Sequence, residues 1–208
     1  MKPVAHTGRL SHRPGRPRAL ALRCVALGSL VTTACASYRG TAESARIDQV
    51  VREPGWVGVA NLPDVRQSGA KDCGAAALSA VLGYWGQPVD AERLDRELRA
   101  GPGRGIRAGD LRDYARGHGL LAFAFYGSLE DVKRELALGR PVIVGTIKPY
   151  DDGRAAAHYE VVVGYHPGRR LVMTLDPAHG FRKNSLDGFM AEWASTNWVT
   201  LVVMAPPG

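Results

Sequence analysis

The feature that most constrains this chain of 208 residues is a cysteine at the expected start of an apolar helix. The stretch 67–85 reads QSGAKDCGAAALSAVLGYW, in which a turn containing glycine and aspartate precedes Cys73. The apolar side chains that follow recur at the spacing of one buried helix face, namely Leu78, Val81, Leu82 and Trp85. We therefore expect Cys73 at a helix N-terminus, where unpaired N–H groups and the helix dipole favour the thiolate.

Two interpretations of this cysteine compete. A free cysteine is commonly a small buried hydrophobic residue with no chemical role. Gln67 favours a chemical role, because its side-chain amide stands six residues before Cys73 and could reach round the turn. An amide donor beside the backbone N–H of Cys73 would form an oxyanion hole, which stabilises the negative charge of an acyl-transfer transition state.

The basic charge of the chain is concentrated at its N-terminus. The whole sequence has a net charge of +7, and residues 1–34 contribute six basic residues and no acidic one. The remaining residues include 21 basic and 20 acidic side chains. The main part of the chain therefore lacks the basic excess typical of nucleic-acid-binding proteins, and we expect no nucleic-acid partner.

The N-terminal segment has the pattern of a secretory signal. Its apolar run at 24–34 is 11 residues long, which is short for a membrane span but suits the central region of a signal peptide. The run ends in Thr-Thr-Ala-Cys, which resembles a bacterial lipobox, so Cys35 is the expected site of lipidation and the new N-terminus. Thr32 departs from this pattern, which prefers leucine, so cleavage as an ordinary signal peptide is the alternative.

The cysteines bear on the chemistry of position 73. If Cys24 leaves with the signal and Cys35 is acylated, Cys73 is the one remaining thiol. An unpaired cysteine in an exported protein is a candidate reactive thiol. Without acylation, a disulfide between Cys35 and Cys73 is the alternative, since the long segment between them would permit it.

The rest of the pattern predicts a single α+β domain. Residues 36–54 are polar, small and weakly periodic, as is typical of a tether. Helical patterns precede strand patterns along the chain, so we expect N-terminal helices packed on a C-terminal antiparallel sheet. The expected parts are a signal peptide at 1–34, a tether at 35–54 and a domain at 55–208. The expected elements after the Cys73 helix are helices near 91–101, 109–117, 129–139 and 185–195, and strands near 120–126, 141–147, 157–165, 170–176 and 198–204.

A cysteine nucleophile needs a base, and the base needs a partner that orients it. Of the six histidines, His158 is the best placed, because it opens a strand beside a loop and can face a cleft. A hairpin turn expected at Pro167-Gly168 brings the end of the next strand, at Asp176, close to His158. Asp176 could then accept a hydrogen bond from the imidazole and fix its tautomer.

These residues resemble the double-glycine (bacteriocin-leader) cysteine peptidases, which belong to the papain-like superfamily. The resemblance rests on Gln67, on the Asp-Cys-Gly triplet, on the small-residue helix ending in GYWG and on the HYEVVVGY and LDP contexts. It implies a papain-like fold that needs no cofactor or metal. It also implies roles for four residues, with Cys73 as nucleophile, His158 as general acid and base, Asp176 as orienting residue and Gln67 as oxyanion donor.

The resemblance covers about residues 61–178, and the chain departs from the family pattern in one respect. Members that process bacteriocin leaders are usually fused to a transmembrane ATP-binding exporter, whereas this sequence has no Walker motif and begins with an export signal. The leading hypothesis is a lipid-anchored, periplasm-facing thiol protease of the cell envelope, with the outer membrane preferred. It would hydrolyse exported peptides or proteins after Gly-Gly through a thioester, with an export system as a further expected partner.

Three alternatives follow from the same residues. One is a binding module that holds a leader or client without turnover, and another is a papain-like amidase or acyl transferase. The third is a zinc site built from His158, Asp176 and His179. An Asp-x-x-His loop is a poor scaffold for zinc, and a second histidine pair is absent from the sequence.

Overall fold

A computed structural model of the chain describes residues 37–99, 101 and 105–207. The expected signal peptide and Cys35 lie outside these residues. No helix among the described residues is both long and apolar enough to cross a bilayer. The elements, in chain order, are β1 (Glu43–Ser44), α1 (Gln49–Arg52), β2 (Val57–Gly58), α2 (Cys73–Tyr84), α3 (Ala91–Leu98), α4 (Ala108–Gly117), β3 (Leu121–Tyr126), α5 (Leu129–Ala137), β4 (Val142–Pro149), β5 (Ala155–His166), β6 (Leu171–Asp176), β7 (Gly180–Ser185), α6 (Leu186–Ala194) and β8 (Val199–Met204).

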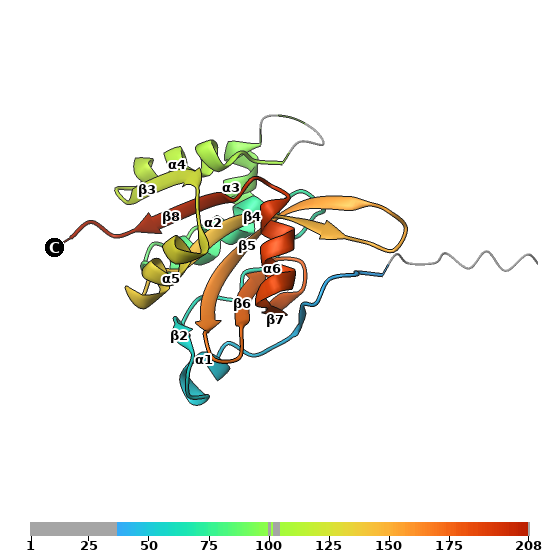
Figure 1. Cartoon of the computed structure of the whole chain (residues 1–208). Helices are drawn as coiled ribbons and strands as arrows, with labels where there is room; N and C mark the ends of the chain where they lie inside the picture. The colour runs from blue at the N-terminus through green and yellow to red at the C-terminus, as the bar shows by residue number, and fades with distance from the viewer. Residues whose placement is uncertain (1–36, 100, 102–104, 208) are drawn as a thin grey trace, which may run out of the picture. The chain divides into compact units, whose positions relative to one another are not determined.

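The strands form one antiparallel sheet, as the sequence predicts. Their order is β1-β7-β6-β5-β4-β8-β3, and β2 pairs with β5. The hairpin expected at Pro167-Gly168 is present, with His166 opposite Leu171. β4 and β5 form a second, longer hairpin that extends beyond the neighbouring strands (Figure 1).

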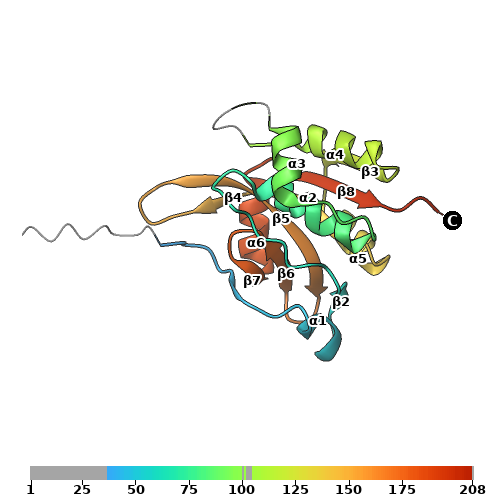
Figure 2. The same ribbon diagram turned by 180° about the vertical axis from the view of Figure 1, so that it is seen from behind.

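Helices cover both faces of this sheet. Successive strand residues point to opposite faces, so Val161 and Val163 pack under α2 while Val162 packs toward α6. Figure 1 shows the face covered by α5 and α6, and Figure 2 shows the face covered by α2 and α3. Because the central strands are buried on both faces, they read as continuous apolar runs. The expected α+β class is confirmed. The sequence predicted N-terminal helices packed on the sheet, and in the structure α5 and α6 cover its other face.

The segment 36–54 is the main difference from the sequence-based expectation of a tether. Its described residues pack on the domain (Figure 1, blue). β1 pairs with β7, and the backbone N–H of Arg39 donates to the carbonyl of Pro149 at 2.9 Å. Val50 is buried in the same apolar cluster as the side chains of α2. We call residues 37–45 the N-terminal strap. Its partners are distant in sequence, so local periodicity gives no sign of them.

Candidate active site

Cys73 is the first residue of α2, as the sequence predicts. The first ten residues of this helix are buried, and it packs between the sheet and the two helices that follow it. A Cβ at Gly74 would lie 3.2 Å from the ring of Tyr159. Glycine at this position therefore lets β5, which carries Tyr159, approach the start of α2 closely.

The loop before Cys73 is fixed to the end of α3 by charge pairing. Asp72 occupies the N-cap position of α2, but its side chain makes no capping hydrogen bond. Its carboxylate instead pairs with Arg99, which also binds Asp95, and accepts a hydrogen bond from the hydroxyl of Ser68 at 3.0 Å. These contacts hold the turn from which the nucleophile helix begins.

Cys73 and His158 line the same cleft, so the thiol and the imidazole lie side by side. Cys73 is a free cysteine and is 7% exposed. Burial alone would raise the pKa of Cys73, but the hydrogen bond and positive charge of His158 outweigh it, and backbone hydrogen bonds at Tyr159 and Gly74 add to their effect. The pKa of Cys73 is therefore lowered, which favours the thiolate.

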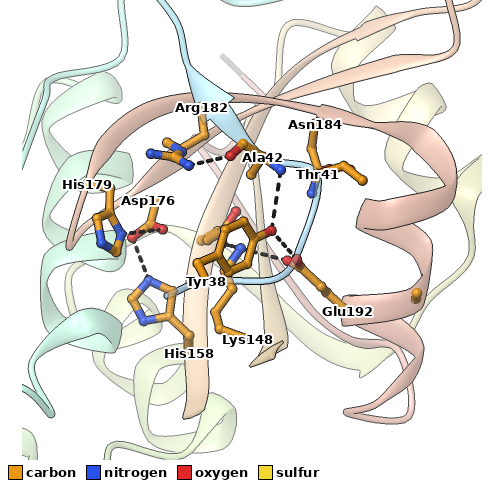
Figure 3. A network of polar contacts seen from close by, with 12 residues as sticks. Tyr38, Thr41, Ala42, Lys148, His158, Asp176, His179, Arg182, Asn184 and Glu192 are labelled. Atoms are coloured by element: carbon orange, nitrogen blue, oxygen red, sulfur yellow. Dashed lines mark hydrogen bonds and ion pairs between the residues drawn. The ribbon is translucent and has the colours of Figure 1, made fainter. Parts of the chain in front are cut away.

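The second partner of His158 is Asp176 at the end of β6. His158 Nε2 lies 2.7 Å from Asp176 Oδ1 (Figure 3). An ionised carboxylate can only accept, so Nε2 carries the proton and Nδ1 is left for the thiol. Burial lowers the pKa of His158, but hydrogen bonds and charge from Asp176 and Cys73 raise it to about 10. Burial of Asp176 is likewise outweighed, mainly by its hydrogen bond and attraction to His158, so the pKa of Asp176 lies well below its usual range.

Gln67 lies in the loop before Cys73 but makes a different contact from the expected one. Its Nε2 donates to the carbonyl of Gly69 at 2.8 Å, and its Oε1 is buried with no hydrogen-bond partner among the described residues. Its backbone N–H donates to the carbonyl of Pro177 at 3.0 Å. Gln67 thus links the loop before Cys73 to the turn after Asp176, and its oxyanion role stays a prediction.

A cleft of about 230 Å³ opens beside Cys73 and His158. A Cβ at Gly145 would lie 3.3 Å from the Cβ of Val199. Glycine at position 145 therefore lets these two residues of the cleft wall pack closely. Four lining residues have no side chain beyond Cβ, namely Ala70, Gly105, Gly145 and Ala157.

The three residues of the zinc alternative lie together, but not as a set of converging ligands. Asp176 Oδ1 accepts from His158, and Asp176 Oδ2 lies 3.1 Å from Nδ1 of His179. The carboxylate lies between the two imidazole rings and is hydrogen-bonded to one nitrogen of each. Glu160 lies close to His158 and Asp176, and its carboxylate is paired with the ammonium of Lys148. This donor set is engaged within the protein, so the geometry favours an orienting carboxylate over a zinc site.

Sequence analysis missed a group of buried charges next to Asp176. Lys148 of β4 pairs with Glu160 of β5 and, at 2.7 Å, with Glu192 of α6. The hydroxyl of Tyr38, in the N-terminal strap, donates to Glu192 (Figure 3). The available signal was a charged residue within each of two apolar strands, VIVGTIKP and AAAHYEVVVGYH.

A comparison with protein-family models decides the relationship. The model described as the peptidase C39-like family matches residues 59–201. The chain belongs to the peptidase C39-like family. No curated protein matches the chain.

Solved structures of peptidases of this family share the fold of the chain. A double-glycine-motif protease from an AMS/PCAT transporter, solved with the leader peptide, matches at 23% identity and a TM-score of 0.56, over 72% of this chain and 95% of that one. A C39-like peptidase from Bacillus anthracis matches at 19% identity and a TM-score of 0.60, over 74% of this chain and 99% of that one. The peptidase domain of Streptococcus ComA, a bi-functional ABC transporter of a quorum-sensing pathway, matches at 24% identity and a TM-score of 0.57. The match covers 68% of this chain and 97% of that one. The expected papain-like fold is confirmed.

Proposed function

We propose that this family member is a cysteine endopeptidase with Cys73 as nucleophile, His158 as general acid and base, and Asp176 as orienting residue. The observation that carries the proposal is that Cys73 and His158 line one cleft, with His158 hydrogen-bonded to Asp176. The lowered pKa of Cys73 and the raised pKa of His158 support a resting pair of thiolate and imidazolium.

The geometry supports acyl transfer in two steps. The thiolate of Cys73 attacks the carbonyl carbon of the scissile peptide, forming a C–S bond and an oxyanion. His158 donates its Nδ1 proton to the amide nitrogen as the C–N bond breaks, which leaves a thioester and a free amine. Neutral His158 then takes a proton from water while the water oxygen attacks the thioester. Breaking of the C–S bond releases the acid and restores the thiolate and the imidazolium.

The oxyanion would form next to the start of α2. The backbone N–H of Cys73 is one of the donors that a helix leaves free at its first turn, and the helix dipole adds positive potential there. Gln67 would supply the second donor by turning its amide away from the carbonyl of Gly69. The substrate oxyanion is a stronger acceptor than that carbonyl and would compensate for the lost hydrogen bond.

We propose that the substrate is a peptide or exported protein that is cut after Gly-Gly. The cleft beside Cys73 has a volume of only about 230 Å³, which suits an extended substrate backbone with small side chains. Glycine lets the substrate backbone approach the thiolate more closely than any other residue does. The similar AMS/PCAT protease was solved with a leader peptide, which is consistent with this class of substrate.

We further propose that the mature protein is a lipoprotein anchored through Cys35 at the periplasmic side of the envelope. The apolar run before Cys35 and its lipobox-like end support this assignment. Two acyl chains supply enough buried hydrocarbon for stable attachment. Cys35→Ser should release the protein from membranes or block its processing, as measured by fractionation and mass spectrometry of the N-terminus. An unmodified N-terminus elsewhere in the chain would refute the anchor.

The test of the proposed activity uses a library of exported peptides and mass spectrometry of the products. Wild-type protein should cut after Gly-Gly or Gly-Ala, and Cys73→Ala should not. Cuts that need Cys73 but follow large or charged residues would reject the double-glycine specificity and keep the peptidase. Peptide binding with no cleavage by the wild type would reject the peptidase in favour of a binding module.

A further inference from the structure

A nearly enclosed group of charges lies on the α6 face of the sheet, behind the proposed catalytic pair. Lys148 is 5% exposed, and its two partners Glu160 and Glu192 are 2% and 4% exposed. Thr146 of β4 lies directly opposite His158 of β5. Lys148 is two residues further along the same strand and so points to the same face as His158.

Such a group is costly as a purely structural device. Removing a lysine and two carboxylates from water costs several kcal/mol per ion, and apolar side chains of similar size often stabilise a core better. Burial lowers the pKa of Lys148, but the attraction of Glu160 and Glu192 outweighs it, so the pKa of Lys148 is raised and the ammonium stays charged. Its positive charge in turn helps to lower the pKa of Asp176.

The N-terminal strap closes this group from the solvent side. The ring of Tyr38 lies over the ammonium of Lys148, with 5.5 Å from Nζ to the ring centroid, and the hydroxyl of Tyr38 donates to Glu192. Arg182 of β7 donates to the carbonyl of Ala42 and holds the strap in place (Figure 3). Strap and sheet together enclose a cavity of about 240 Å³. Its lining includes Tyr38, Ala42, Lys148, Asp176, His179 and Arg182.

We propose that Lys148 is a positioning residue for Asp176, and that Tyr38 of the N-terminal strap shields Lys148 from water so that its charge acts on Asp176. This inference rests on the proposed function, because it assigns Asp176 to the orientation of His158. The strap is then a working part of the catalytic centre, although it is distant in sequence from every other residue of the site.

The sign of the effect follows from the charges around Asp176. Removing the ammonium leaves the buried carboxylates without their shared cation, so Asp176 holds a proton more readily and supports the imidazolium less well. A weaker imidazolium gives the thiolate of Cys73 less support, so the pH at which the thiolate forms is raised. The groups that face this region are Tyr38 from the strap, Cys73 from α2, Lys148 from β4, His158 and Glu160 from β5, Asp176 and His179 from the β6 end, Arg182 from β7 and Glu192 from α6.

The test reads the ionisation of the thiol and does not need a substrate. The full chain is treated with iodoacetamide across a range of pH, and peptide mapping gives the alkylation rate of Cys73 separately from the other cysteines. The rate follows the thiolate fraction. Lys148→Met should raise the midpoint by about one pH unit. Tyr38→Ala, which opens the ammonium to water, should raise it by less in the same direction.

Two matched variants control for general effects. Lys133→Met removes a lysine of α5 that pairs with Glu130 at the surface, and Thr41→Val removes a strap contact to Asn184 that does not reach Lys148. Both should keep the wild-type midpoint. A cooperatively folded Lys148→Met with an unchanged midpoint overturns the proposal.

If Lys148→Met does not fold, Tyr38→Ala decides, and a wild-type midpoint in that variant overturns the proposal. The outcome is distinct from a failure of the proposed function. A wild type that cleaves no peptide can still show a lowered alkylation midpoint that depends on Lys148.

Discussion

The two partners of His158 come from regions that are built in different ways. Cys73 stands at the start of a helix of small and apolar residues, and the loop before it is held mainly by Ser68 and by Arg99 of the nearby α3 end. Asp176 lies among buried charges from β4, β5 and α6, closed by the N-terminal strap. The proposed nucleophile thus depends mostly on one helix and the segments next to it, and the proposed orienting carboxylate on contacts across the whole chain. Substitutions on the two sides should therefore differ in what they change.

The largest expected effect is on the nucleophile side. Cys73→Ala and His158→Ala should remove turnover, with losses on the order of 10⁴-fold or more. Cys73→Ala should keep the fold, because it removes only the sulfur atom. His158→Ala should fold with lower stability, because it removes the partner of Asp176. Peptide hydrolysis and circular dichroism measure the two properties. A folded Cys73→Ala protein that still cleaves peptide would rule out the nucleophile assignment.

Asp176→Asn should affect both activity and folding, which separates it from Cys73→Ala. The neutral amide cannot support the imidazolium, and the loss of rate should reach about 10⁴-fold. The same change weakens hydrogen bonds to His158, His179 and the backbone N–H of Ala178, at a cost of about 1–3 kcal/mol of unfolding free energy. Urea unfolding measures that cost. If Asp176→Asn unfolded with the same free energy as the wild type, Asp176 would not differ from Cys73 in its effect on stability.

Gln67→Ala should have a smaller effect on rate. Loss of one oxyanion donor lowers kcat by about 10²- to 10³-fold. Gln67→Glu is the matched control, since it keeps the size of the side chain but removes the donor. Full activity of a folded Gln67→Ala protein would assign the residue to the loop contact with Gly69 alone.

A pH dependence of stability is also expected from the pair of His158 and Asp176. The pKa of His158 is about 10 in the folded protein and 6.5 in its ordinary state. A raised pKa stabilises the fold at pH values below 6.5, and this contribution is lost as the pH rises through 10. The urea midpoint should therefore fall between pH 7 and about pH 10.5, and fall less in His158→Gln. Equal falls in both proteins would show that His158 is not charged in the fold.

Local sequence patterns were sufficient to predict the positions of Cys73, His158 and Asp176. Helix periodicity located Cys73, and the hairpin turn brought the strands of His158 and Asp176 together. It missed β7, which has the polar sequence GFRKNS, and the strap that pairs with it, because their partners are far away in the chain. Buried charges such as Lys148 were missed because their burial depends on partners from several elements.

If Cys35 is acylated as proposed, the docked strap would limit how far the domain can stand from a membrane. The backbone N–H of Ser37 donates to the carboxylate of Asp151 at 2.9 Å, and the N–H of Asp151 donates back to the carbonyl of Ser37 at 3.0 Å. Under the proposed acylation of Cys35, only about 7 Å of extended chain separates the lipidated residue from this fixed point. The tip of the β4–β5 hairpin would then lie against the lipid headgroups, and the enzyme would work on substrates as they emerge at the bilayer surface.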